Sequence, residues 1–245
     1  MKKCCSTIFV TVGALTFSAS ASSLILADNF NAPNTGNFDN SDQTGRRSGL
    51  AGADIQLRSS RRQHGIIDNQ LDLARPGGGS GRVRFHDANS LSDWHDWSSG
   101  AAGALITTDG GFRVEFDWTP ANNTDTNWVS WSVGFSQGPE PGIRLNNAET
   151  DFGILFRNNG GTERFDNSAA GVTGTPFTAT TISRHVTLEY TFTSWADGSD
   201  VSVNAWVDGT DVIPGGYDFS WDNNLGGVSF ELGSNVASGT RIDNF

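Results

Sequence analysis

Short stretches that alternate apolar and polar residues recur along most of the chain. In GFRVEFDWT, residues 111–119, the apolar side chains are Phe112, Val114, Phe116 and Trp118, with charged residues between them. A period of two places all the apolar side chains on one face of an extended strand, whereas a helix needs a period near 3.6. Such strands are stable only when their apolar faces pack together, so the pattern indicates an all-β protein made of paired layers.

The strands that this pattern predicts are separated by Gly, Asn, Asp and Pro, and no helical period of useful length follows the N-terminal segment. They cover residues 24–30, 53–58, 70–74, 81–86, 112–119, 128–136, 152–157, 185–193, 200–207, 227–233 and 240–245. Thirty glycines supply turns, and Asp197-Gly198 and Asp208-Gly209 are favoured hairpin pairs. We therefore expect a two-sheet antiparallel β-sandwich, with a single domain over residues 22–245.

The first 21 residues have the three parts of a secretory signal peptide. Lys2 and Lys3 form the basic start, residues 8–17 form an apolar run, and small residues end at Ala21. The run is too short for a membrane span, which needs about 20 residues. We expect cleavage after Ala21, with Ala27 as the alternative, and a secreted or cell-surface protein without a transmembrane anchor in this chain.

Both cysteines, Cys4 and Cys5, fall inside the predicted signal peptide, so we expect no disulfide in the exported part. The formal net charge of the chain is −11. Nucleic-acid-binding proteins carry basic patches, so this charge argues against a nucleic-acid partner. The chain ends at Phe245 without a recognisable sorting signal, which leaves open a released protein or a sequence that continues.

One part of the sequence runs against the acidic trend. Its arginines are Arg46, Arg47, Arg58, Arg61, Arg62, Arg75, Arg82 and Arg84. They could hold an acidic polysaccharide. Pairing with carboxylates of the same protein is the favoured interpretation, since such ion pairs are common.

The order of the segments FRVEFDWTP, WVSWSVGF, RHVTLEYTF, VSVNAWVDG and the terminal IDNF resembles concanavalin A-like, laminin G-like jelly rolls of secreted bacterial proteins. The resemblance covers about residues 24–245 and implies a jelly-roll sandwich. It does not select among lectins, glucanases, lyases and adhesion modules, which share this fold.

The resemblance also implies a structural calcium ion where the first and last strands meet, with Asp28 and Asp243 as ligands. The related sequences LILADNF, residues 24–30, and GTRIDNF, residues 239–245, suggest that the two ends of the chain lie side by side. No defined calcium-binding loop is present, and turn capping by Asn and Asp is the alternative.

Glu115 and Asp117 match the first two positions of the Glu-x-Asp-x-(x)-Glu pattern of laminarinase-type glucanases. The acid/base position is broken, because Thr119 or Pro120 stands there and neither transfers a proton. Retaining hydrolysis needs carboxyl groups about 5–5.5 Å apart, and alternate strand residues are roughly 6.6–6.8 Å apart. A glycosidase would need a second carboxylate from a neighbouring strand. The candidates for it are Glu189 and Glu231.

Two groups of aromatic residues are candidates for glycan contact. Trp206 shares the polar face of its strand with Asn204, and an outward indole can stack on a sugar ring unless a loop covers it. Trp94 and Trp97 flank Asp96 in the segment SDWHDWSSG, residues 92–100. They could clamp a ligand at the rim of the sandwich or pin the loop to the sheet.

These observations favour a secreted, non-catalytic jelly-roll domain that binds a polysaccharide or other glycan, or is part of the cell surface or matrix. One alternative is a glycan-cleaving enzyme, glucanase- or lyase-like, that uses Glu115 with a carboxylate from a neighbouring strand. The other is a purely structural module. Calcium is the only cofactor that we expect.

Overall fold

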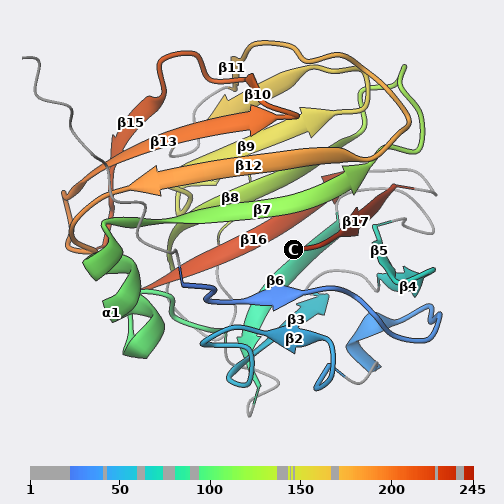
Figure 1. Cartoon of the computed structure of the whole chain (residues 1–245). Helices are drawn as coiled ribbons and strands as arrows, with labels where there is room; N and C mark the ends of the chain where they lie inside the picture. Colours follow the sequence, from blue (N-terminus) through green and yellow to red (C-terminus); the bar gives the residue numbers. More distant parts are fainter. Residues whose placement is uncertain are drawn as a thin grey trace, which may run out of the picture.

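We describe the protein from a computed structural model of the chain. It describes residues 23–40, 43–59, 64–73, 81–88, 94–136, 143, 145, 147–166, 171–223, 226–235 and 240–245. The predicted signal peptide lies outside these residues. Two antiparallel sheets face each other and enclose the core (Figure 1).

The first layer is a seven-stranded sheet with the order β11-β10-β9-β8-β16-β6-β3. Its strands are β3 (Ile55–Ser59), β6 (Gly81–Asp87), β8 (Trp128–Ser136), β9 (Phe152–Arg157), β10 (Thr162–Phe165), β11 (Val172–Thr173) and β16 (Gly227–Asn235). The longest ladder joins β16 to β8 over all nine residues of each strand. This sheet therefore has its centre at two segments that are about 100 residues apart in the sequence.

The second layer is an eight-stranded sheet with the order β14-β13-β12-β7-β17-β5-β4, and β15 pairs with β13 beside it. Its strands are β4 (Gly65–Ile67), β5 (Gln70–Asp72), β7 (Gly111–Thr119), β12 (Arg184–Thr191), β13 (Asp200–Val207), β14 (Thr210–Asp211), β15 (Tyr217–Ser220) and β17 (Arg241–Asp243). A separate two-stranded ladder joins β1 (Ala27–Asp28) to β2 (Arg47–Ser48). A 3-10 turn covers Phe38–Asn40.

The all-β, two-sheet antiparallel sandwich expected from the sequence is confirmed. In β7 the side chains of Val114, Phe116 and Trp118 are buried, whereas those of Arg113 and Glu115 are exposed. The buried faces of both sheets join one hydrophobic cluster that runs from Phe30 to Ile242. The period-two pattern thus placed the main core correctly. The seven-stranded sheet also carries a second, smaller apolar cluster on its other face, formed by Leu145, Leu155 and Phe165.

One helix was missed. α1 (Gly100–Asp109) lies at one end of the sandwich where β7 begins, although no helix was expected after the N-terminal segment (Figure 1). Ala102 and Ile106 pack on the core, and Gly110 ends the helix in the left-handed region at φ 79°. The terminal glycine and the helix-forming residues before it were the available signal. Within the described part of the chain, no helix has the length and apolarity needed to cross a membrane.

The central strands were predicted to within about two residues, whereas the short ones were not. The predicted strand 24–30 is reduced to β1, and the predicted strand 240–245 to β17. Strands of two to four residues carry too little alternation to stand out in a sequence. The strands that were not predicted are β2, β4, β10, β11, β14 and β15.

The two ends of the described chain lie side by side. The backbone N–H of Asp28 donates to the carbonyl oxygen of Phe245 at 2.7 Å, and the N–H of Phe245 donates back to Asp28 at 3.2 Å. This reciprocal pair confirms the adjacency suggested by the related sequences at the two ends. Asp28 thus pairs with the chain just beyond β17, which itself lies between β7 and β5.

Candidate functional site

The outer face of the eight-stranded sheet brings together most of the polar candidates from the sequence. Strands β7, β12 and β13 are neighbours there (Figure 1). Two adjacent rows cross them: Glu115, Thr187 and Trp206 in one, and Arg113, Glu189 and Asn204 in the next. Residues opposite each other in a ladder share a face, so these side chains all project away from the core.

His185 of β12 lies between the two carboxylates of β7. Its Nδ1 is 2.9 Å from Oδ1 of Asp117, and its Nε2 is 3.2 Å from Oε1 of Glu115. Asp117 also accepts a hydrogen bond of 2.8 Å from the side-chain amide of Asn244. Sequence reasoning missed His185, because 68 residues separate it from Asp117 and only the strand register joins them.

The position of His185 favours its charged form. The hydrogen bond to Asp117 raises the pKa of His185 above its ordinary value of 6.5, partial burial opposes this, and the hydrogen bond to Glu115 adds to the rise. A doubly protonated imidazole donates from both ring nitrogens, one to each carboxylate. The imidazolium therefore orients both acids of β7 on the surface.

Arg113 bridges the two glutamates of this face. Its guanidinium contacts Glu115 on the same strand and lies 3.4 Å from Oε1 of Glu189 on β12. Inverting glycosidases need room for a water between two carboxyl groups. Here a guanidinium lies between Glu115 and Glu189, so the pair does not form such an acid–base site.

Glu231 is not brought near Glu115. It belongs to β16 of the seven-stranded sheet and is buried, with 3% of its surface exposed. Its carboxylate accepts a hydrogen bond of 2.8 Å from Nε of Arg84 and lies 3.7 Å from Nε of Arg82. The predicted partnership of Glu115 and Glu231 therefore does not exist, because sequence alternation does not tell which sheet a strand joins.

Trp206 lies where the sequence placed it, on the outer face of β13 with Asn204 on the same face of the strand. Both side chains are half-buried. In register, Trp206 lies between Thr187 of β12 and Asp211 of β14. The indole is thus a partly exposed apolar surface within a polar face of the sheet.

The candidate residues Trp94, Asp96 and Trp97 lie in one loop, and two of them hold this loop against the sheet. Trp97 is buried, with 4% exposed, and its ring stacks on Phe230 at a centroid distance of 4.7 Å. Asp96 Oδ1 accepts a hydrogen bond of 3.0 Å from the backbone N–H of Val228. Trp94 is half-buried and forms an isolated bridge with His86. Trp97 and Asp96 therefore attach this loop to β16 and do not form a clamp at the rim.

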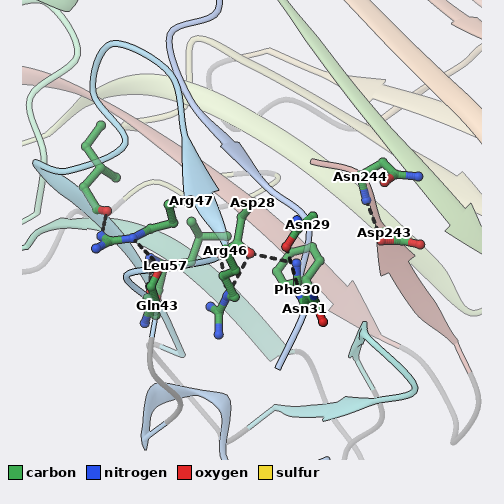
Figure 2. A network of polar contacts seen from close by, with 11 residues as sticks. Asp28, Asn29, Phe30, Asn31, Gln43, Arg46, Arg47, Leu57, Asp243 and Asn244 are labelled. Carbon is green, nitrogen blue, oxygen red and sulfur yellow. Dashed lines mark hydrogen bonds and ion pairs between the residues drawn. The ribbon is translucent and has the colours of Figure 1, made fainter. Parts of the chain in front are cut away.

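The predicted calcium ligands are occupied by other contacts. Asp28 is fully buried, and Nε of Arg46 lies 2.8 and 3.0 Å from its two carboxylate oxygens. Figure 2 shows the contacts of Asp28 running to Arg46 and Phe30, and that of Asp243 running to Asn244. The described residues contain no group of three or more His, Cys, Asp or Glu side chains that could hold a metal ion. Asp28 and Asp243 therefore do not fit the calcium site that the resemblance implies.

Three arginines of the basic stretch pair with carboxylates of the same protein. Arg46 pairs with Asp28, and Arg82 and Arg84 pair with Glu231, as the favoured interpretation expected. Other members donate to backbone carbonyls: Arg47 to Ile55 and Arg58 to Asp39. Arg61, Arg62 and Arg75 lie outside the described residues.

Comparisons with known proteins are distant. No protein-family model matches the chain, and a search of curated proteins finds no match. Among solved structures, the chain is similar to a sialidase, with a TM-score of 0.36 and 10% identity over 78% of this chain and 17% of that one. It is also similar to the acidic lectin of winged bean, with a TM-score of 0.40 and 14% identity over 78% and 90% of the two chains.

An alginate lyase solved with an alginate tetrasaccharide gives a TM-score of 0.42 and 11% identity, over 76% of this chain and 84% of that one. This chain thus spans less than a fifth of the sialidase and most of the lectin and the lyase. Scores this low carry no argument about function. The fold assignment rests on the two sheets, and the candidate site rests on its own geometry.

Proposed function

We propose that the protein binds neutral glycans on the outer face of the eight-stranded sheet. The observation that carries this proposal is the row Glu115, Thr187 and Trp206, which sets a partly exposed indole across from oriented carboxylates. Trp206 on β13 and Glu115 on β7 are two strand spacings apart, which is roughly 9.6 Å. A sugar ring on the indole would therefore have its hydroxyl groups within reach of the acids of β7.

The chemistry of the face suits sugar hydroxyls. The C–H groups of a pyranose favour the face of an aromatic ring, and the rigid indole loses little entropy on binding. Carboxylates accept hydrogen bonds from hydroxyls, and the Asn204 amide both donates and accepts. His185 and Asn244 hold Asp117, and Arg113 holds Glu115, so these acceptors are oriented before a ligand arrives.

Charge is the reason to expect neutral glycans. The carboxylates of Glu115, Asp117 and Glu189 are gathered on this face, with Arg113 and His185 as the cations beside them. The whole chain carries a net charge of −11. Uronates and sialylated sugars would be repelled by this surface and by the field of the protein.

Cleavage of the glycan is not part of the proposal. Glu115 has His185 and Arg113 as neighbours, and Glu231 is in the other sheet. Export by residues 1–21 and a single domain over residues 22–245 stay predictions that accompany the proposal. Together they describe a secreted glycan-binding protein of the surface or matrix, with the concanavalin A-like jelly roll as its proposed family.

A glycan array tests the proposal with neutral and uronate-containing oligosaccharides. We expect neutral ligands to be retained, and Trp206→Ala to weaken their binding on the order of tenfold, as expected for the loss of about 1.4 kcal/mol of stacking energy. Ile182→Ala is the matched control, because this apolar side chain is 70% exposed and lies outside β7, β12 and β13.

Three results would contradict the proposal. They are retention of uronates alone, unchanged affinity in Trp206→Ala, and an absence of signal for all the neutral glycans. Release of reducing sugar from a bound glycan would instead support the enzymatic alternative. Loss of that release in Glu115→Gln would assign it to this face.

A further inference from the structure

β17 covers only part of its neighbour β7. The two strands pair where Arg241–Asp243 faces Asp117–Thr119. On the opposite edge of β7, β12 pairs with every residue from Gly111 to Trp118. Among the described strands, the β17-side edge of Gly111–Glu115 therefore has no ladder partner.

The free edge presents hydrogen-bonding groups. The N–H of Phe192 donates to the carbonyl of Gly110 at 3.0 Å, so the even-numbered residues that follow on β7 bond toward β12. In an antiparallel ladder successive residues bond to opposite sides. The backbone N–H and C=O groups of Arg113 and Glu115 therefore point toward the uncovered side.

A second backbone segment lies across from this edge. Residues 23–26 precede Asp28, which pairs antiparallel with Phe245. An antiparallel pair continues in register, so the line of β17 extended past Phe245 runs between residues 23–26 and Gly111–Glu115. A cavity of about 440 Å³ lies there, and both segments line it together with Phe245. We call this space the strand slot.

The walls of the strand slot differ between its floor and its mouth. The floor is aromatic and includes Phe112, Trp131, Tyr190 and Phe230. Phe112 stacks on Tyr190 with a centroid distance of 4.5 Å. The mouth on the outer face is mainly acidic. It is lined by Asp109, Arg113, Glu115 and Glu189.

We propose that the strand slot receives an extended segment of a basic partner polypeptide, which adds a strand to β7. Residues of the segment opposite Arg113 and Glu115 would project outward, and the residue between them would project inward. The chemistry of the slot thus calls for a basic residue opposite Glu115 and an apolar residue next to it. The residue opposite Arg113 is polar and uncharged, because like charges directly opposite each other in a ladder repel. The apolar side chain enters the aromatic floor, and the basic one meets Glu115 and Glu189. A second basic residue, opposite Gly111, would lie toward Asp109.

A peptide suits the slot better than an apolar small molecule. The N–H and C=O groups of Arg113 and Glu115 need partners once water is excluded, and a peptide strand supplies them at the right spacing. Charge points to another chain, because this one has 27 acidic and 16 Lys and Arg residues.

The experiment uses two blocked peptides of the sequence Lys-Val-Ser-Phe-Lys-Val with the full protein, so that Ser stands opposite Arg113 in an antiparallel pairing. One is unmodified, and the other is N-methylated at alternate residues so that it cannot donate to β7. We expect calorimetry to detect the unmodified peptide with at least tenfold higher affinity. We also expect it to slow hydrogen exchange at the amides of Arg113 and Glu115 at least tenfold.

Two variants accompany the peptides. Arg113→Pro removes an N–H that faces the slot and not β12, and an open strand edge tolerates proline. We expect this variant to weaken binding of the unmodified peptide. If that variant does not fold, Glu189→Lys serves instead. We expect it to bind the basic peptide more weakly, because it replaces an acidic side chain of the slot with a basic one. Trp206→Ala should leave peptide binding unchanged, so failure of the glycan proposal is distinguishable from failure of this one.

Three outcomes would overturn the proposal. Equal affinity of the two peptides would mean that the slot takes apolar groups without strand pairing. Binding without protection at Arg113 and Glu115 would place the peptide elsewhere. Protection of these amides before any peptide is added would mean that a segment of this chain already fills the slot.

Discussion

Arg46 and Asp28 form a fully buried ion pair in which Nε of the guanidinium contacts both carboxylate oxygens, at 2.8 and 3.0 Å. The same carboxylate accepts a hydrogen bond of 2.8 Å from the N–H of Phe30. The pair holds β1 against β2 beside the point where Asp28 meets Phe245. It therefore fixes the position of β1, which directly follows residues 23–26, one wall of the strand slot.

We predict that Arg46→Ala destabilises the protein by about 3–5 kcal/mol, because it leaves a buried carboxylate without its counter-charge. Urea unfolding measures the effect. Arg241→Ala is the control, since it removes an exposed pair with Asp68 at 3.3 Å and should cost less than about 1 kcal/mol. Equal losses in the two variants would contradict the stabilising role of the buried pair.

Asp151 should make stability fall as pH rises from about 4 to about 7. Burial raises the pKa of Asp151 from 3.8 to about 7, and the nearby carboxylates of Asp222 and Asp197 add to the rise. The folded protein thus keeps a proton that the unfolded chain loses, so ionisation favours unfolding. The resulting loss in unfolding free energy is on the order of 4 kcal/mol once Asp151 is fully ionised. Below about pH 4 Asp151 is protonated in both the folded and the unfolded state, so the loss disappears.

The variant Asp151→Asn isolates this contribution. We expect it to unfold at higher urea concentration than the wild type at pH 8 and to match it near pH 4. The quantity to compare is the difference in unfolding free energy between the two proteins across that range. A difference that does not change with pH would exclude Asp151 as its source.

His185 should titrate above its ordinary pKa of 6.5, because Asp117 and Glu115 stabilise the imidazolium. The protonated bridge contributes stability below pH 6.5 and loses it as pH rises through the raised pKa. Proton NMR of the ring measures this directly. Asp117→Asn should lower the pKa more than Glu115→Gln, since the hydrogen bond to Asp117 is the larger cause.

Calcium should leave the melting temperature unchanged relative to chelator. Asp28 is engaged by Arg46, and Asp243 accepts from the backbone of Asn244. A ligand that binds only the folded state raises the melting temperature as its concentration increases. A melting temperature that rises with calcium concentration would therefore show a calcium site other than the one predicted at Asp28 and Asp243.

Alternation along the sequence determined the faces of the strands. Phe116 and Trp118 had to face inward and Glu115 outward, because a period of two allows no other assignment in a strand with one buried face. The same argument placed Trp206 and Asn204 on the outer face of β13. The Gly, Asn, Asp and Pro residues between the strands also indicated the turns of an antiparallel sandwich. The face of each side chain and the positions of the turns are local properties, so they can be predicted from the sequence without knowing which strands pair.

Only the tertiary structure decided which strands are neighbours and in what register. His185 meets Asp117 because β12 pairs with β7 at that offset, and a slip of one residue would separate them. Glu231 and Glu115 looked equivalent in sequence but belong to different sheets. Pairing depends on packing across long stretches of chain, which no local pattern encodes. For that reason the contacts of His185 with Asp117 and Glu115, and the strand slot, emerged only from the fold.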